Sequence, residues 1–195
     1  MKRIILKMAL LLVVISACNN KASDAKATAD TTTSSVDTRT TAPEPVATGK
    51  DSASIQQILD NYLQIKNALT NDNGKAASSA AGELKSSLAN FNKTTLAGDQ
   101  LKMYTEAESE ALEHAEHIAA NAGNLKHQRF HFSDLSTVIY DLVKEFGNGQ
   151  QLYYDHCPMF NDGKGADWLS ETKQIKNPYY GKAMLSCGTV KETLK

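Results

Sequence analysis

The chain has 195 residues, with 21 Lys and Arg against 22 Asp and Glu, 41% hydrophobic residues and 7% aromatic ones. This length allows one ordinary globular domain together with additional segments. The balanced charge, with no long basic run, excludes a nucleic-acid partner that is bound by neutralising phosphates. Three cysteines are too few for a disulfide-dense scaffold.

The first 17 residues have the layout of a secretory signal peptide. Three basic residues precede a short apolar run over 8–15, and small residues then lead into Cys18. The apolar run is far shorter than the ~20 residues that a membrane span needs. An ordinary signal peptide followed by an unrelated cysteine would share these features.

The sequence Ile-Ser-Ala-Cys at 15–18 resembles the lipobox of bacterial lipoproteins. The resemblance implies that residues 1–17 are removed and that Cys18 is acylated on its sulfur and on its new amino group. Several acyl chains hold a domain firmly on a membrane, because each buried methylene contributes about 0.8 kcal/mol. Residue 19 is Asn and not Asp, which favours the outer membrane. We therefore expect a lipoprotein of the bacterial envelope, anchored in the outer membrane by the lipid on Cys18 and facing the periplasm.

Residues 18–50, which begin with the lipidated cysteine, are expected to form a disordered tether. From Asn19 to Lys50 the chain has no Leu, Ile, Met or aromatic residue, and it is rich in Thr, Ser, Ala and Asp. Such a segment cannot bury enough apolar surface to offset the entropy that ordering would cost. Its expected role is to hold the following domain clear of the membrane.

Residues 51–195 are expected to form one domain that begins with helices. In the first helix, which Asp51 or Ser52 can cap, apolar residues recur with the spacing i, i+3, i+4 and i+7. The turn sequence at 71–74 ends this helix. A second helix follows, and the small residues on its apolar face favour close approach to a neighbour.

Two more helices are expected further along. The third spans 98–121 with a row of Glu on its outer side, and the fourth starts at Ser133 and ends at Gly147. Four amphipathic helices with short connections favour an antiparallel four-helix bundle, because this arrangement buries all four apolar stripes. The expected fold is therefore mainly α.

Four of the five histidines lie in this helical part. His114 and His117 are three residues apart, so a helix makes them neighbours, and His127 and His131 lie just before the expected fourth helix. The first pair could hold a metal, but no H-E-x-x-H pattern surrounds it. We expect all four to be surface or capping residues. No P-loop, G-x-G-x-x-G or G-x-S-x-G motif occurs, so the sequence predicts a protein that is not an enzyme.

The last part of the domain, at about 150–190, is expected to be a looped lobe. Helical periodicity stops after Gly149, and the lobe concentrates turn residues and the only tryptophan, Trp168. Short strands are expected at 151–154 and 184–186.

Two sulfur-bearing segments mirror each other within this lobe. Residues 157–159 read Cys-Pro-Met and residues 184–187 read Met-Leu-Ser-Cys, so a hairpin between them would bring two thiolates and two thioethers together. Such soft ligands select Cu(I) or Ag(I), whereas a closed zinc site prefers four Cys or His ligands. Trp168 can pack over a bound cation. The candidate ligands are Cys157, Met159, Met184 and Cys187, with His156 as an additional one.

A longer pattern runs through the same region. It reads C-P-M, G-x-G-A-x-W-L-S, I-x-N-P-Y-x-G and M-L-x-C-G, and R-x-x-F-x-x-L-S precedes it. The pattern resembles an uncharacterised bacterial envelope domain of unknown function, found in small lipoproteins and at the C-terminus of membrane-fusion adaptors of copper/silver efflux pumps. The resemblance covers about 55–190 and implies a helical bundle, heavy-metal handling and an efflux adaptor as partner. It supplies no proven activity. The segments that carry it are residues 129–136, 157–159, 163–170, 175–181 and 184–188.

A disulfide between Cys157 and Cys187 is the competing interpretation. Two cysteines in one domain often form a bridge in an oxidising envelope, and closing this loop would contribute about 3–4 kcal/mol. The methionines and Trp168 would then be hydrophobic filling. The sequence thus predicts either a membrane-tethered periplasmic module that binds Cu(I) or Ag(I), linked to efflux or metal homeostasis, or a structural or interaction lipoprotein with a stapled lobe. The two states can alternate, with oxidation abolishing metal binding.

Overall fold

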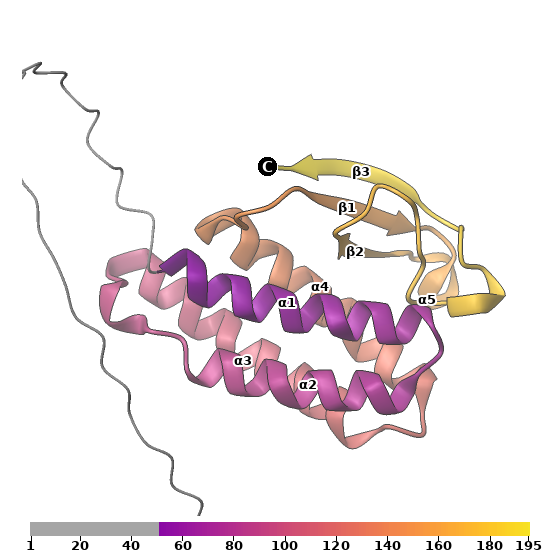
Figure 1. Ribbon diagram of the computed structural model, residues 1–195, viewed down its shortest axis with the longest axis horizontal. Coiled ribbons are helices and arrows are strands. Elements are labelled where there is room, and N and C mark those ends of the chain that lie inside the picture. The colour runs from indigo at the N-terminus through magenta and orange to yellow at the C-terminus, as the bar shows by residue number, and fades with distance from the viewer. Residues whose placement is uncertain (1–50) are drawn as a thin grey trace, which may run out of the picture. The chain divides into compact units, whose positions relative to one another are not determined.

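The computed structural model describes residues 51–195, which form a mainly helical body followed by a small antiparallel sheet (Figure 1). The expected signal peptide at 1–17, the lipid attachment at Cys18 and the tether at 18–50 lie outside the described residues. Within the described part, no helix combines the length and the apolar character that crossing a membrane would require.

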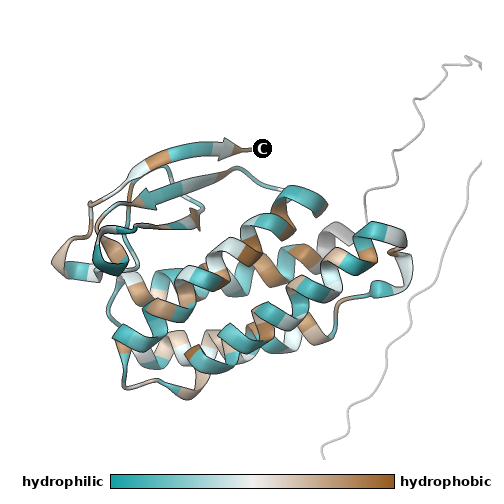
Figure 2. Ribbon diagram, turned by 180° about the vertical axis from the view of Figure 1, so that it is seen from behind, coloured by the Kyte–Doolittle hydropathy of each residue, from teal (hydrophilic) through white to brown (hydrophobic). Residues whose placement is uncertain are grey.

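Four long helices make up the body: α1 (Asp51–Thr70), α2 (Gly74–Ala89), α3 (Gly98–Ala120) and α4 (Leu125–Phe146). Each packs on the next along the chain, and α1 also packs on α4. Their buried apolar residues belong to one shared core. Hydrophilic and hydrophobic residues alternate along each helix (Figure 2). A short 3-10 turn, η1 (Lys93–Thr95), lies between α2 and α3. The expected end of the first helix at 71–74 and the expected span of the third are confirmed.

The fourth helix starts earlier than the sequence predicts. We expected Ser133 to begin it, but α4 begins at Leu125. Asn124 caps it, because its side chain accepts a hydrogen bond from the His127 amide at 3.2 Å. Ser133 lies inside the helix, where its hydroxyl donates to a carbonyl three residues back at 2.6 Å. His127 and His131 therefore stand on the first turns of a helix.

The C-terminal lobe is a three-stranded antiparallel sheet with β1 in the middle. The strand expected at 151–154 is present as β1 and extends to Cys157. The prediction of a strand at 184–186 is wrong, because local hydrogen bonds fold this stretch into a turn. The Cys187 amide donates to the Met184 carbonyl at 3.1 Å. The strands are β1 (Leu152–Cys157), β2 (Ala166–Ser170) and β3 (Thr189–Leu194), and the connections contain α5 (Phe160–Gly163) and η2 (Gly181–Ala183).

A buried tyrosine joins this sheet to the helices. Tyr62 on α1 is fully buried, and its hydroxyl accepts a hydrogen bond from the Leu169 amide of β2 at 3.0 Å. The same hydroxyl lies 2.8 Å from that of Ser136 on α4. Burial raises the pKa of Tyr62 well above its usual value, so the phenol stays neutral. One side chain thus connects α1, α4 and β2.

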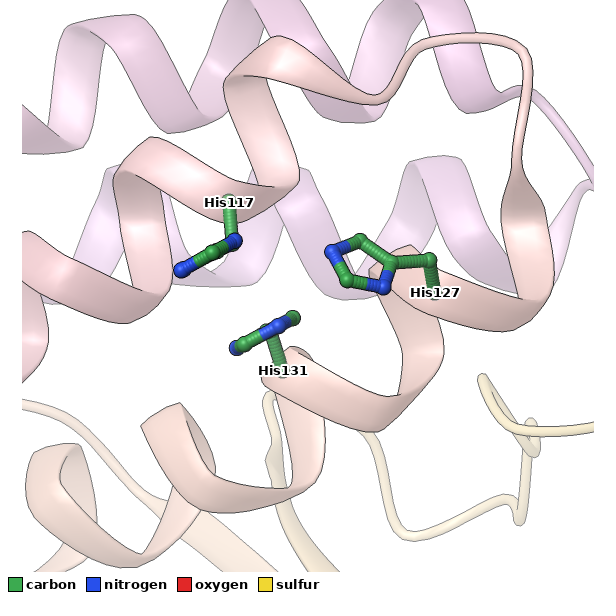
Figure 3. Close-up of side chains that lie close together, drawn as sticks. All are labelled: His117, His127 and His131. Atoms are coloured by element: carbon green, nitrogen blue, oxygen red, sulfur yellow. The ribbon is translucent and has the colours of Figure 1, made fainter.

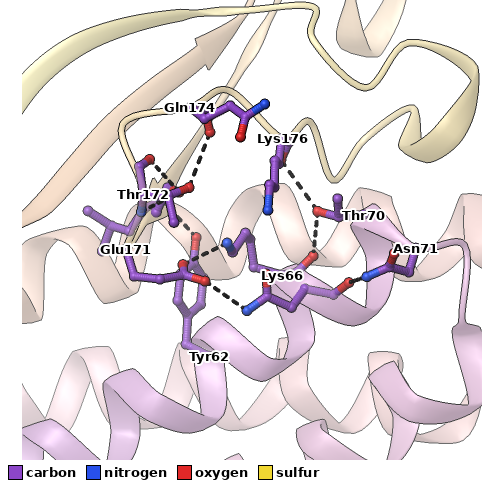
Figure 4. Close-up of polar contacts among 11 residues, drawn as sticks. Tyr62, Lys66, Thr70, Asn71, Glu171, Thr172, Gln174 and Lys176 are labelled. Atoms are coloured by element: carbon purple, nitrogen blue, oxygen red, sulfur yellow. Dashed lines mark hydrogen bonds and ion pairs between the residues drawn. The ribbon is translucent and has the colours of Figure 1, made fainter.

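A buried lysine makes a second connection (Figure 4). Lys66 on α1 is fully buried, and its ammonium lies 2.6 Å from the carboxylate of Glu171 in the loop after β2. Asn67 donates to the other carboxylate oxygen at 2.9 Å. Burial lowers the pKa of Lys66, and the hydrogen bond to Glu171 opposes that effect. The carboxylate therefore keeps the buried ammonium charged.

Glu171→Gln is expected to lower the free energy of unfolding by about 2–3 kcal/mol, because it leaves a buried ammonium without its counter-charge. Urea denaturation of the purified protein measures this loss. The double variant Lys66→Met/Glu171→Gln should recover most of it, since it removes the buried charge as well. A double variant no more stable than Glu171→Gln would contradict this account.

Asp155 is another buried ionisable group, on the inward side of β1. Its side chain is fully buried, and neither carboxylate oxygen has a hydrogen-bond partner among residues 51–195. Burial raises the pKa of Asp155 to about 7, while the charge of Lys66 opposes the shift. The folded protein therefore holds a proton at a pH where the unfolded chain has already released it.

Asp155 should make stability fall as the pH rises from about 4 to about 7, because the folded state binds more protons than the unfolded state in that window. Above pH 7 the penalty is constant. Asp155→Asn has the same shape and no ionisation, so it should gain about 1–3 kcal/mol at pH 8 and much less at pH 4. Urea unfolding at several pH values tests this. An equal gain at both ends of the range would show that ionisation is not the cause.

Candidate functional site

The two cysteines of the lobe lie next to each other beside the end of β1. Cys157 is the last residue of β1 and is buried, whereas Cys187 just precedes β3 and is half-buried. Strand β3 runs antiparallel to β1 with Thr189 opposite His156, which brings the chain at Cys187 alongside the turn after Cys157. Both cysteines are free thiols in the part of the chain that the structure describes.

Asn177 holds the segment that carries Cys187. Its side chain is fully buried and donates to the Cys187 carbonyl at 2.7 Å. Its backbone amide donates to the Leu185 carbonyl at 2.8 Å. Its side-chain oxygen accepts hydrogen bonds from the amides of Tyr179 and Tyr180 at 2.8 and 3.2 Å. This one side chain therefore closes the loop between 177 and 187.

Gly188 allows that segment to approach β1. It has a φ of 143°, and a Cβ at this position would lie 2.8 Å from the His156 carbonyl oxygen and 2.9 Å from the ring of Trp168. Both approaches are too close for a side chain. The glycine after Cys187 is therefore required for the two cysteines to meet.

Trp168 lies next to Gly188, where the segment that carries Cys187 approaches β1. It is fully buried, and its ring meets that of Tyr179 edge to face at 5.8 Å. Tyr179 in turn stacks on Phe160 at 4.4 Å. The three rings form an apolar cluster, and the ring of Trp168 lies next to the backbone of Gly188. The expectation that Trp168 covers a bound cation stays a prediction.

The upstream R-x-x-F-x-x-L-S segment, at 129–136 on α4, contacts the loop that leads to Cys187. Arg129 on α4 donates to the Pro178 carbonyl at 2.8 Å and pairs with Asp72 at 2.6 Å. Phe132 lies against Tyr179 with ring centroids 5.9 Å apart. The helices thus hold the loop that positions Cys187.

The two methionines lie in turns that adjoin the thiols. Met159 is 50% exposed, and its carbonyl accepts a hydrogen bond from the Tyr180 hydroxyl at 2.9 Å. Met184 is half-buried, three residues before Cys187. Ligation by either thioether stays a prediction.

His156 faces away from Cys157. Successive residues of a strand point to opposite faces, and along β1 Cys157 is buried while His156 is half-exposed. The Nδ1 atom of His156 lies 2.6 Å from a carboxylate oxygen of Asp167 on β2. The structure therefore places this candidate ligand in a separate polar pair.

The Cys157 thiol affects the ionisation of Cys187. Partial desolvation and the adjoining Cys157 thiol raise the pKa of Cys187 above its usual value. A negative charge on one thiol disfavours a negative charge on its neighbour, and a cation bound between the two would remove this repulsion.

Cys157→Ser should lower the pKa of Cys187, because it removes the neighbouring thiol. The alkylation of Cys187 by iodoacetamide should then start at a lower pH than in the wild type, since the thiolate is the nucleophile. Mass spectrometry of the reduced protein over pH 7–10 measures this, with Ser186→Ala as a matched control. Identical pH profiles in the wild type and Cys157→Ser would contradict the contact.

A second group of candidate site residues lies between α3 and α4 (Figure 3). His117, His127 and His131 each offer a ring nitrogen, and these atoms lie within 4.8 Å of one another. His114 joins the group, with its Nδ1 atom 3.1 Å from that of His131. All four are partly exposed, as expected for surface residues. Their gathering was not predicted.

The sequence does contain a signal for this cluster. The two pairs lie at similar distances on either side of the turn that joins α3 and α4, so an antiparallel helix pair brings them together. The late start expected for α4 hid this symmetry, because it left His127 and His131 outside the helix.

Comparison with known proteins links the helical part to a family without an assigned function. A family model described as "Protein of unknown function (DUF3347)" matches residues 58–151. This fits the uncharacterised domain that the sequence pattern resembles. The match covers α2, α3, α4 and most of α1, and it ends just before β1 and the cysteine segments. No curated protein and no solved structure matches the chain.

Proposed function

We propose that this protein is a non-enzymatic, membrane-tethered module that binds Cu(I) or Ag(I) in the periplasm and serves heavy-metal efflux or homeostasis. The observation that carries the proposal is the pairing of two free thiols, Cys157 and Cys187, at the same end of β1. Thiolate is the ligand that soft monovalent ions prefer, and it binds them far better than it binds Mg²⁺ or Ca²⁺.

The surroundings of the thiols support a prearranged site. Asn177 and Gly188 hold Cys187 in place by contacts that need no metal. Trp168 forms an apolar floor, which limits competition from water. An ion that binds here would therefore meet ligands that lose little conformational entropy on binding.

The methionines supply the adaptable part of the proposed site. Thioether side chains are flexible and soft, so Met159 and Met184 can complete the coordination of an ion held by the thiols. Met159 is exposed at the edge of the lobe. This exposure gives a partner, for which we propose an efflux adaptor protein, a route to the ion by ligand exchange.

We further infer that the four packed helices form an antiparallel four-helix bundle that carries the lobe. In this proposal the lipid on Cys18 anchors the protein in the outer membrane, and residues 18–50 span the distance to the domain.

The closeness of Cys157 and Cys187 also favours one alternative function. Two adjacent thiols in an oxidising compartment readily form a disulfide. A Cys157–Cys187 bridge would fasten the loop at 177–188 to β1 and would make the protein a structural or interaction lipoprotein.

Titration of the reduced protein with Cu(I) under anaerobic conditions, against a chromophoric chelator, tests the proposal. We expect one equivalent to bind tightly and Cys157→Ser/Cys187→Ser to abolish this binding. Met159→Leu and Met184→Leu should weaken it, whereas Met103→Leu on α3 serves as the matched control and should not. Binding that survives the double cysteine variant would place the site elsewhere.

Thiol labelling of protein taken directly from cells separates the two functions. Labelling of both cysteines without reductant is expected for the metal-binding module. Complete resistance until reductant is added would favour the stapled lipoprotein.

A further inference from the structure

We infer that His117, His127 and His131 form a binding site for a divalent transition-metal ion of the Zn²⁺ or Cu²⁺ class on the face between α3 and α4. The site is separate from the lobe, and the inference does not depend on metal binding by Cys157 and Cys187. It rests on the positions of the three imidazoles and on the contact that orients one of them.

Two helices and the turn between them bring the three rings together. His117 is on the last turn of α3, and His127 and His131 are four residues apart, so both lie on one face of α4. Asn124 fixes the start of α4 through its capping bond. The backbone that carries the rings is therefore regular helix, which places side chains more accurately than a loop does.

The rings converge on one region (Figure 3). Those of His117 and His131 are parallel, with centroids 4.1 Å apart, and His127 approaches His131 at 4.5 Å with an interplanar angle of 64°. One nitrogen of each ring lies within 4.8 Å of the others. Three nitrogens at this spacing can reach a shared ion once rotation about the side-chain bonds turns the rings of His117 and His131 out of their parallel arrangement.

The imidazole of His131 is available in the form that binds metals. Burial lowers the pKa of His131 to about 4, and the neighbouring His117, His127 and His114 lower it further. His131 is therefore neutral at pH 7. A divalent ion coordinates the neutral ring, whereas a proton would compete for the same nitrogen.

His114 acts as a positioning residue for His131. Its Nδ1 atom lies 3.1 Å from that of His131, and its Nε2 atom lies 3.9 Å from a carboxylate oxygen of Glu110. A hydrogen bond to the second ring nitrogen of a metal-bound histidine fixes the orientation of its ring, so His114 can orient His131 for metal binding.

The ligand set selects a different ion from the one proposed for the lobe. Imidazole suits Zn²⁺, Cu²⁺ and Ni²⁺, and Cu²⁺ heads the general order of affinity for divalent ions. Three ligands leave a coordination position open on the exposed side, which is typical of sites where the ion or a small molecule exchanges.

The test uses the whole protein with Cys157→Ser/Cys187→Ser, so that thiols cannot contribute. Zn²⁺ and Cu²⁺ are titrated separately against a competing chelator. We expect one equivalent of each to bind, and His117→Gln/His131→Gln to abolish stoichiometric binding. His156→Gln, which alters the remaining histidine of the described domain, is the matched control and should bind normally. The inference is overturned if the protein with all its histidines binds neither ion. It is also overturned if binding persists in His117→Gln/His131→Gln.

Electron paramagnetic resonance of the Cu²⁺-loaded protein supplies an independent readout. Nitrogen couplings from three imidazoles are expected, and His127→Gln should remove one of them. His114→Gln should weaken binding about 10–100-fold and leave the number of coupled nitrogens unchanged. Circular dichroism checks that each variant is folded. Couplings that do not change in His127→Gln would contradict the assignment.

Discussion

The hydroxyl of Tyr62 joins three elements that are far apart in the chain, and the position of the lobe depends on it. It accepts a hydrogen bond from Leu169 on β2 and bonds to Ser136 on α4, in a region from which water is excluded. The ion pair between Lys66 and Glu171 reinforces this contact on the same face of α1. Because β1 lies between β2 and β3, fixing β2 to the helices also fixes the strand that ends at Cys157.

Two groups of candidate metal ligands with different chemistry occur among the described residues of this domain. The thiols lie at the end of the sheet, and the imidazoles lie on the α3–α4 face. Thiolate favours soft monovalent ions and imidazole favours borderline divalent ones. The two proposed sites would therefore take different ions, and the histidine site is tested in a variant without the two thiols.

Part of the candidate site could be predicted from the sequence. The mirrored Cys and Met segments indicated that Cys157 and Cys187 would meet if the stretch between them folds back as a hairpin. The geometry of the strand was harder to foresee: His156 is adjacent to Cys157 in sequence but faces the opposite side of β1. Residues 184–186 form no strand, because the Cys187 amide bonds to the Met184 carbonyl and the Asn177 amide bonds to the Leu185 carbonyl. The histidine cluster was missed because the Asn124 cap starts α4 two turns before Ser133.

By itself, the sequence determined the four amphipathic helices and the change to an irregular, sulfur-containing lobe, since hydrophobic periodicity and turn residues act over short stretches of chain. Only the tertiary structure decided that Lys66 and Asp155 are buried, that the two thiols touch, and that four histidines on two helices share one face. These features depend on which distant segments pack together, and residue spacing does not specify the partner of a buried side chain.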